Sequence, residues 1–425
     1  MKKALIITYY WPPAGGSGVQ RWLKFVKYLR DFGIEPVIYT VENPDYPLLD
    51  TSLQKDIPEG VEVLKQPIWE PYKLASIFSK KKNVKTSAGF LSPKKSLASK
   101  VMTYVRANYF IPDARMFWIK PSISYLEKYL KENPVDFVIT TGPPHSLHLI
   151  GLGLKEKLNT NWIADFRDPW TKIDYFHQLP LTKKAKKKHH FLEEKVLKKA
   201  DKVLVVGRTM KKEFDAFSNE VYVVENGFDS EISEDHKFEL DSKFLITHIG
   251  LMNADRNHEI FWKSLQELCH EVSGFKEDLN LKLIGKLDVS VLDAIKKYDL
   301  ENNVEIIDYL PHDEVIAYQR KSQVLLLSVN NVPSAKAIIT GKIFEYLMAK
   351  RPIIGIAPKD GDLAEILKET NSGVVADFQD KEKLKQIISE YYTTYQKGNL
   401  SVQSKNIEKY HRRELTKKMV EIINS

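Results

Sequence analysis

Short apolar runs alternate with amphipathic helical stretches along almost the whole chain. The first run, residues 4–9, is followed by a glycine-rich loop, a helical pattern over 19–30 and a second apolar run at 35–40. The same alternation resumes at 245–249, after a polar and acidic stretch at 230–241. Strands that alternate with helices form parallel sheets. The sequence therefore predicts an α/β protein with two Rossmann-like β/α/β domains that face a central cleft.

The acidic stretch sets the expected domain boundary. Residues 1–232 are predicted to form the N-terminal domain, and residues 233–403 the C-terminal domain. A terminal amphipathic helix is expected over residues 404–425.

Composition excludes several classes of protein. The chain has one cysteine, Cys269, so it forms no intrachain disulfide, and a cytoplasmic location fits. The first apolar run stops at Trp11, too early for a signal peptide. Proline and glycine interrupt the uncharged stretch 137–154, so a membrane-spanning helix is not expected there. The net charge of +8 is compatible with nucleic acid, an anionic membrane or phosphorylated substrates. No nucleic-acid-binding module is visible, so nucleic acid is not expected as a partner.

The stretch 335–358 combines a loop, a short helix and a buried strand. Lys342 opens the helix, and the apolar residues that follow fall at helical spacing. Gly341 and Lys342, beside a helix N-terminus, suit a phosphate group. Glu345, in the first turn, can accept hydrogen bonds from two hydroxyls of a sugar ring. The alternative interpretation is an ordinary amphipathic helix with a solvated carboxylate.

Polar residues also follow the predicted strands of the first domain. They form three groups: the loop with Gly16, Ser17 and Gly18, the segment from Thr141 to His148, and the segment Asp165–Trp170. The carboxyl ends of parallel strands meet at one edge of a sheet, where ligands bind. Each group alone is equally compatible with a structural role.

Two segments are rich in basic residues. Residues 71–112 contain nine lysines and arginines, no acidic residue, and interleaved aromatic and aliphatic side chains. Residues 182–199 form a helical pattern with a lysine-rich start. Such segments can lie on an anionic bilayer, here the inner face of the membrane. A site for a phosphorylated acceptor and a solvated insertion are the alternatives.

Four motifs together resemble the GT-B glycosyltransferases, and within them family four, the retaining group-one enzymes. They are Gly15-Gly16-Ser17-Gly18, the segment Asp165–Trp170, Asn226-Gly227-Phe228-Asp229, and the segment from Gly341 to Leu347. The resemblance spans nearly the whole chain. It implies that Glu345 holds the ribose of the donor nucleotide. The family's second glutamate, eight positions earlier, is Ala337 here, so the usual pair is incomplete.

The resemblance also implies that residues 1–232 are the acceptor-side domain and residues 233–403 the nucleotide-sugar-binding domain. It further implies which residues form the site. The donor-binding residues are expected to be Gly16, Ser17, Gly18, Arg167, Gly250, Arg256, Gly285, Lys336, Gly341, Lys342 and Glu345. The candidate catalytic residues are His145, His148, Asp168 and Arg256. Neither a metal nor another cofactor is expected, and the terminal helix is expected to pack back on the first domain.

The resemblance implies a hexosyltransferase that moves a sugar from a nucleotide-sugar donor to a glycan or lipid-linked acceptor with retention. Its role would lie in cell-envelope or exopolysaccharide biosynthesis. The alternatives are a nucleotide-sugar epimerase or hydrolase of the same fold and a catalytically silent sugar-nucleotide-binding protein.

Overall fold

The computed structural model describes residues 1–70, 97–229, 239–308, 310 and 312–425. These residues form two compact units. Unit 1 comprises Met1–Asn226 and Arg412–Ser425, and unit 2 comprises Gly227–His411. The expected boundary at 232/233 falls outside the described residues. The expected final segment, 404–425, is divided: its helix belongs to unit 1 and its first eight residues to unit 2.

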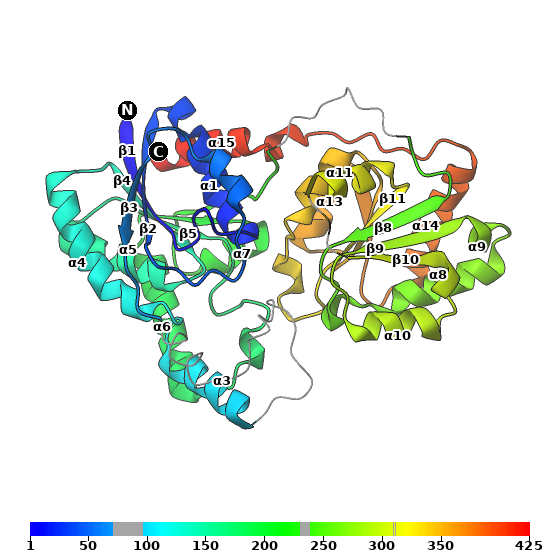
Figure 1. Cartoon of the computed structure of the whole chain (residues 1–425), viewed down its shortest axis with the longest axis horizontal. Helices are drawn as coiled ribbons and strands as arrows, with labels where there is room; N and C mark the ends of the chain where they lie inside the picture. The colour runs from blue at the N-terminus through cyan, green and yellow to red at the C-terminus, as the bar shows by residue number, and fades with distance from the viewer. Residues whose placement is uncertain (71–96, 230–238, 309, 311) are drawn as a thin grey trace. The chain divides into compact units, whose positions relative to one another are not determined.

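Unit 1 is built on a parallel sheet whose described strands have the order β3-β2-β1-β4-β5-β6-β7 (Figure 1). The strands are β1 (Lys2–Ile7), β2 (Ile34–Val41), β3 (Glu62–Gln66), β4 (Phe137–Gly142), β5 (Trp162–Phe166), β6 (Lys202–Val205) and β7 (Val221–Val223). The order reverses between β1 and β4. Loops that follow these two strands diverge at such a point and leave space for a ligand.

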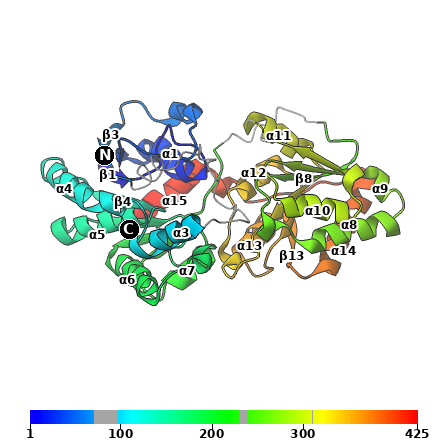
Figure 2. The ribbon, with the colours of Figure 1, turned by 60° about the horizontal axis from the view of Figure 1, so that its bottom comes forward.

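Helices cover the sheet of unit 1. They are α1 (Ser17–Leu29), α3 (Leu97–Tyr109), α4 (Met116–Glu132), α5 (Ser146–Leu158), α6 (Lys183–Lys199), α7 (Arg208–Phe214) and α15 (Arg412–Asn424). The terminal helix α15 packs along α1, as Figures 1 and 2 show. Lys2 Nζ donates to Oδ1 of Asn424 at 2.8 Å, so both termini lie in unit 1.

Unit 2 repeats the architecture with the described strand order β10-β9-β8-β11-β12-β13, again parallel (Figure 1). The strands are β8 (Phe244–Ile249), β9 (Leu279–Ile284), β10 (Val304–Ile307), β11 (Val324–Ser328), β12 (Ile353–Ile356) and β13 (Gly373–Ala376). The helices are α8 (Glu259–Glu271), α9 (Phe275–Asp278), α10 (Val289–Lys297), α11 (His312–Lys321), α12 (Lys342–Ala349), α13 (Asp362–Thr370) and α14 (Lys381–Gln396). The order reverses between β8 and β11.

Strand β11 shows why these sheets are parallel and covered on both faces. Val324 and Leu326 belong to one apolar cluster, whereas Leu325 and Leu327 belong to another. A strand with apolar side chains on both faces must be buried between two layers of helices. The predicted fold class, α/β with two Rossmann-like domains, is confirmed. Among the described residues, no helix is long and apolar enough to cross a membrane.

A buried ion pair fixes the carboxyl ends of the central strands in unit 1. Arg21 on α1 and Asp165 on β5 are almost fully enclosed, and Nη2 of Arg21 lies 2.8 Å from Oδ1 of Asp165. The carboxylate also accepts hydrogen bonds from Nε1 of Trp22 at 2.7 Å and from Oγ1 of Thr141 at 2.9 Å. Burial raises the pKa of Asp165, but Arg21 and the hydrogen bonds outweigh it, so the pKa is lowered. The carboxylate therefore ties α1, β4 and β5 together.

We expect Asp165→Asn to lower the free energy of unfolding by about 3–5 kcal/mol, because it leaves Arg21 buried without a counter-charge. Asp31→Asn is the control, since Asp31 pairs with Arg413 at the exposed surface, and it should change stability by less than about 0.5 kcal/mol. Urea denaturation followed by intrinsic fluorescence measures both. Equal effects of the two variants would contradict the structural role of Asp165.

The same pair predicts a pH dependence. Because the folded-state pKa of Asp165 is lowered, its stabilising contribution is complete above about pH 4, the ordinary carboxyl value. The contribution is lost as the pH falls through the lowered value. The stability difference between wild type and Asp165→Asn should therefore narrow below about pH 4.

Candidate functional site

Unit 2 brings the loop after β8 and the start of α12 together at the carboxyl edge of its sheet. Gly250, directly after β8, has a φ of +110°, which favours glycine. A Cβ atom at Gly250 would lie 2.2 Å from Cε and 2.8 Å from Nζ of Lys342. Glycine here therefore lets the Lys342 side chain pass directly over the backbone.

Lys342 is the residue in unit 2 that most directly indicates an anionic ligand. Its side chain is half-buried, and within the part of the chain that the structure describes it has neither a hydrogen-bond acceptor nor an ion-pair partner. Burial lowers the pKa of Lys342, Glu345 opposes this effect, and Arg256 adds to it. A partly desolvated cation is costly to leave unpaired, so the position favours an anion.

Arg256 supplies a second positive charge that acts on Lys342. It ends a short 3₁₀ turn, Ala254–Arg256, in the loop after β8. Its Nε donates to Oδ1 of Asn330 at 2.6 Å, and its Nη1 donates to the carbonyl of Leu251 at 3.1 Å. Because Asn330 follows β11, these bonds hold the guanidinium where the strand order reverses. Two cations held there suit the charges of a diphosphate.

Glu345 lies three residues after Lys342 on α12, and residues at this spacing share one face of a helix. The Glu345 side chain is half-buried, and its Oε2 accepts a hydrogen bond from Nε2 of Gln319 at 3.3 Å. The carboxylate retains further acceptor capacity for hydroxyl groups. The structure therefore brings Arg256, Lys342 and Glu345 into one cluster.

Three residues that the sequence analysis did not single out complete this region. The hydroxyl of Tyr346 accepts the backbone N–H of Ile249 at 3.1 Å and so pins α12 to β8. His248 is buried, and burial followed by Lys342 lowers its pKa to about 3, which keeps it neutral. The hydroxyl of Thr340 is buried without a partner among the described residues. Of these three residues, only Tyr346 lies within the sequence motif around Glu345, so the sequence could have indicated only Tyr346.

The remaining expected donor-binding residues of unit 2 are placed differently. Gly285 lies against Gly250, because a Cβ there would meet the Gly250 carbonyl oxygen at 2.8 Å. Gly341 is exposed and precedes α12. Lys336 is exposed, and its Nζ pairs with Oδ2 of Asp360 at 2.5 Å rather than with the cluster. Ala337 is half-buried at the end of a 3₁₀ turn and offers no polar side-chain group.

In unit 1, Arg167 joins two of the loops that the sequence placed at one sheet edge. Its Nη1 donates to the carbonyl of Gly18 and its Nη2 donates to the carbonyl of Pro143. Gly16 precedes α1, and Ser17 is the first residue of that helix. The glycine-rich loop, the loop after β4 and the loop after β5 are therefore brought together. Burial lowers the pKa of Arg167, which remains a cation.

His148 and His145 have different surroundings. His148 is fully enclosed, stacks on Phe166 at 4.3 Å, and its Nδ1 lies 2.9 Å from Oγ1 of Thr140. Burial lowers its pKa to about 3. His145 lies nearer the surface, at 7% exposure, and burial followed by His148 lowers its pKa well below the usual value. The structure thus favours His145 as the histidine that contacts a ligand.

Gly142 lies between the two imidazoles. A Cβ atom there would lie 2.5 Å from Nε2 of His148 and 2.9 Å from Nδ1 of His145. Both nitrogens are buried and lack hydrogen-bond partners among the described residues. A neutral imidazole with an unpaired nitrogen can accept a hydrogen bond from a hydroxyl group or donate one.

Asp168 is exposed beside Arg167, at the same edge as His145. In the described ranges, no group of three or more histidine, cysteine or carboxylate side chains is arranged to hold a metal ion. Unit 1 therefore presents a carboxylate, a guanidinium and a neutral imidazole at one sheet edge. These groups can orient a polyhydroxylated ligand and exchange a proton with it.

Two family models match the chain. Residues 229–410 match the model described as glycosyl transferases group 1, and residues 89–232 match the model described as glycosyltransferase family 4. No curated protein matches the sequence. The matched regions correspond to most of unit 2 and to the second half of unit 1.

Solved structures are similar over the full length at low identity. The apo form of WaaB, a lipopolysaccharide outer core galactosyltransferase, has a TM-score of 0.62 at 13% identity and covers 100% of this chain and 99% of its own. A mutant of TarM from S. aureus, in complex with Fondaparinux, alpha-GlcNAc-glycerol and UDP, has a TM-score of 0.60 at 12% identity, with 100% of both chains covered.

UDP-GlcNAc 2-epimerase from Methanocaldococcus jannaschii is similar with a TM-score of 0.54 at 14% identity, covering 99% of each chain. At these identities the neighbours establish the fold alone. The family models add the class of enzyme. From the two models and the fold together, the chain belongs to the group 1 glycosyltransferases of the GT-B fold.

Proposed function

We propose that this glycosyltransferase moves a hexose from a nucleotide-sugar donor to a glycan or lipid-linked acceptor, with retention and without an obligatory metal. The observation that carries the proposal is the half-buried Lys342 ammonium, which has no partner among the described residues and lies beside Arg256 and Glu345. Its biological setting would be cell-envelope or exopolysaccharide biosynthesis.

The chemistry of transfer fits these residues. As the sugar leaves, negative charge develops on the nucleoside diphosphate, and fixed cations stabilise that charge without a metal. Lys342 and Arg256 would supply the cations, and Glu345 would accept the ribose hydroxyls. Neutral His248 adds no competing positive charge.

In unit 1, His145 would contact the transferred sugar or the acceptor hydroxyl, and Asp168 would orient or deprotonate that hydroxyl. Retention through a covalent intermediate would require a carboxylate nucleophile at the anomeric carbon. Neither His145 nor Asp168 is assigned the role of nucleophile. The proposed route is therefore front-face attack, in which the acceptor hydroxyl approaches the anomeric carbon from the side on which the diphosphate leaves. Arg167 would hold the two loops that present these groups.

Nucleotide binding tests the donor site. Calorimetry with UDP, GDP, ADP and TDP should show that one diphosphate binds and that Glu345→Ala weakens it by about 2–4 kcal/mol, because a charged hydrogen-bond acceptor is lost. Lys342→Met, which keeps the side-chain length, should cost about 1.5–3 kcal/mol.

Lys368→Ala is the matched control, since this lysine is exposed on α13 of the same unit. It should leave the affinity unchanged. If Glu345→Ala and Lys342→Met bind as wild type does, the nucleotide lies elsewhere and the assignment of the donor site is wrong.

A second candidate function is an epimerase or hydrolase, which the similarity to the M. jannaschii epimerase favours. Product analysis by NMR distinguishes the activities, because epimerisation and hydrolysis need no glycan acceptor. For a transferase, sugar should appear on the acceptor at the rate at which diphosphate is released.

Ala337 favours a third candidate, a silent sugar-nucleotide-binding protein. Turnover by wild type that is lost in Arg256→Ala would exclude this candidate.

The proposed lipid-linked acceptor agrees with a surface on unit 1 that we propose contacts the inner face of an anionic membrane. Residues 71–96 of the first basic segment lie outside the described residues. Its described helix, α3, exposes an apolar strip: Val101, Met102, Tyr104, Val105 and Tyr109. The first turns of α6 expose a row of lysines: Lys183, Lys184, Lys186, Lys187 and Lys188.

Helices α3 and α6, which carry the apolar strip and the lysine row, lie side by side, as Figures 1 and 2 show. Nδ2 of Asn108 on α3 donates to the carbonyl of Pro180 at 2.8 Å, and the backbone N–H of Thr182 donates to Oδ1 of Asn108 at 2.7 Å. Asn108 thus fixes the start of α6 against α3. Apolar side chains beside lysines match the interface of an anionic bilayer.

Vesicle co-sedimentation tests this surface. Wild type should bind phosphatidylcholine vesicles that contain phosphatidylglycerol more strongly than vesicles of phosphatidylcholine alone. Reversal of Lys184 and Lys187 to glutamate should weaken binding at least about tenfold, since each lysine near the surface contributes about 1 kcal/mol. The control reverses Lys120 and Lys128, exposed on α4. Equal losses in both double variants, or no wild-type binding, would refute the membrane contact.

A further inference from the structure

The loop after β5 covers one face of His145 with an aromatic ring. Trp170 is almost fully buried, and its indole lies parallel to the imidazole, with centroids 5.0 Å apart and an interplanar angle of 3°. The other neighbouring rings, Phe166 and His148, are tilted and lie 5.9 Å and 5.7 Å away. Trp170 therefore makes the closest ring contact of His145 among these three.

A carboxylate on α6 holds this loop. Glu193 is 8% exposed and accepts three hydrogen bonds: from the backbone N–H of Trp170 at 3.2 Å, and from the backbone N–H and Oγ1 of Thr171 at 3.1 Å and 2.5 Å. Burial raises the pKa of Glu193, whereas the bonds from Thr171 and Trp170 oppose that change. The carboxylate fixes the backbone on both sides of the Trp170 carbonyl.

A histidine one turn earlier on α6 fixes the indole ring itself. Nε1 of Trp170 donates to Nδ1 of His189 at 3.0 Å, so Nδ1 of His189 must be unprotonated. Burial lowers the pKa of His189 to about 4, so the imidazole is neutral and can accept this bond at neutral pH. Backbone and ring of Trp170 are thus both held from the same helix.

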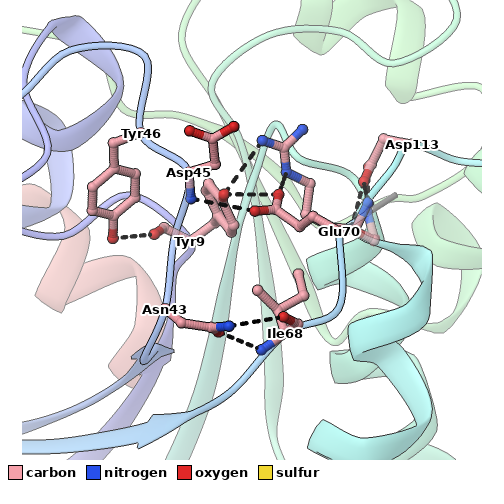
Figure 3. A network of polar contacts seen from close by, with 9 residues as sticks. Tyr9, Asn43, Asp45, Tyr46, Ile68, Glu70 and Asp113 are labelled. Carbon is pink, nitrogen blue, oxygen red and sulfur yellow. Dashed lines mark hydrogen bonds and ion pairs between the residues drawn. The ribbon is translucent and has the colours of Figure 1, made fainter. Parts of the chain in front are cut away.

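The backbone beside His145 is fixed independently. Asp113 accepts hydrogen bonds from the backbone N–H of Ser146 at 2.9 Å and from its hydroxyl at 2.8 Å. Figure 3 shows Asp113 next to the network of Tyr9 and Glu70, in which the Tyr9 hydroxyl donates to Oε1 of Glu70 at 2.9 Å. The start of α5 is therefore anchored, and the loop after β5 holds the His145 ring through the Trp170 stack and a hydrogen bond to the backbone of Pro169.

We propose that Glu193 and His189 are positioning residues that lock Trp170 against His145 and thereby fix the orientation of the His145 imidazole. This inference rests on the proposed function, in which His145 contacts the sugar or the acceptor. Desolvating a carboxylate is costly, and an apolar side chain could fill the same volume. What Glu193 adds is a single orientation of the loop.

The direct test is the NMR spectrum of protein labelled with ¹³C-histidine, in which His145→Gln identifies the His145 signals. In wild type the stacked indole should shift these signals upfield. Glu193→Gln and Thr171→Val, which removes one donor to Glu193, should move them towards ordinary positions. Thr171→Ser keeps the hydroxyl and should retain the wild-type spectrum. Glu194→Gln is the control, because Glu194 pairs with Lys198 at the surface.

The functional test uses the UDP-, GDP-, ADP- or TDP-sugar that the calorimetric panel selects. Glu193→Gln and Thr171→Val should lower kcat about 10- to 100-fold, the scale of a misplaced catalytic group. The affinity for the free diphosphate, which depends on unit 2, should stay within about twofold of the wild-type affinity, whereas a tenfold loss would correspond to about 1.4 kcal/mol. Thr171→Ser, unlike Thr171→Val, should have the kcat of wild type.

Unchanged His145 signals in both variants would overturn the inference, and so would altered signals with wild-type kcat. Absence of turnover in wild type would instead contradict the proposed function. In that case the NMR comparison would still decide whether Glu193 orients His145.

Discussion

The Arg21–Asp165 ion pair determines where the polar groups of unit 1 can lie. Two charges removed from water are stable only when each satisfies the other, and here the carboxylate also binds Trp22 and Thr141. The pair thereby joins α1 to the carboxyl end of β5, and Arg167 follows Asp165 by two residues. In unit 2, half-buried Lys342 has no such partner among the described residues. That contrast separates a charge that stabilises the fold from one that awaits a ligand.

Apolar content explains which elements the sequence could predict. Strands such as β11 are apolar on both faces, so continuous runs identify them. Strand β3, Glu62–Gln66, was not predicted. It lies at the sheet edge, has no fully buried residue and carries charged side chains, so it contains no apolar run. Helix α4 was likewise not singled out, although Trp118 and Leu126 are buried on it.

The candidate site was predictable where its residues belong to one local motif. Lys342 and Glu345 share a helix turn, so their spacing alone places them together. Glu193 and His189 could not be found in this way. They lie in a helix whose lysines indicate a solvated surface, and their partner Trp170 is about twenty residues away in the chain. A buried carboxylate in a basic helix becomes recognisable only when the tertiary contact is seen.

The basic residues of this chain have two environments, and burial distinguishes their roles. The lysines at the start of α6 are exposed, so salt screens their fields within about 10 Å at 0.1 M ionic strength. They can attract an extended anionic surface but cannot select one anion. Lys342 is half-buried over Gly250, where salt screens its charge less and an anion would have to contact it directly. The net charge of the chain is compatible with many partners. The half-buried ammonium of Lys342 beside the guanidinium of Arg256 favours one kind of partner, a compact and multiply charged anion.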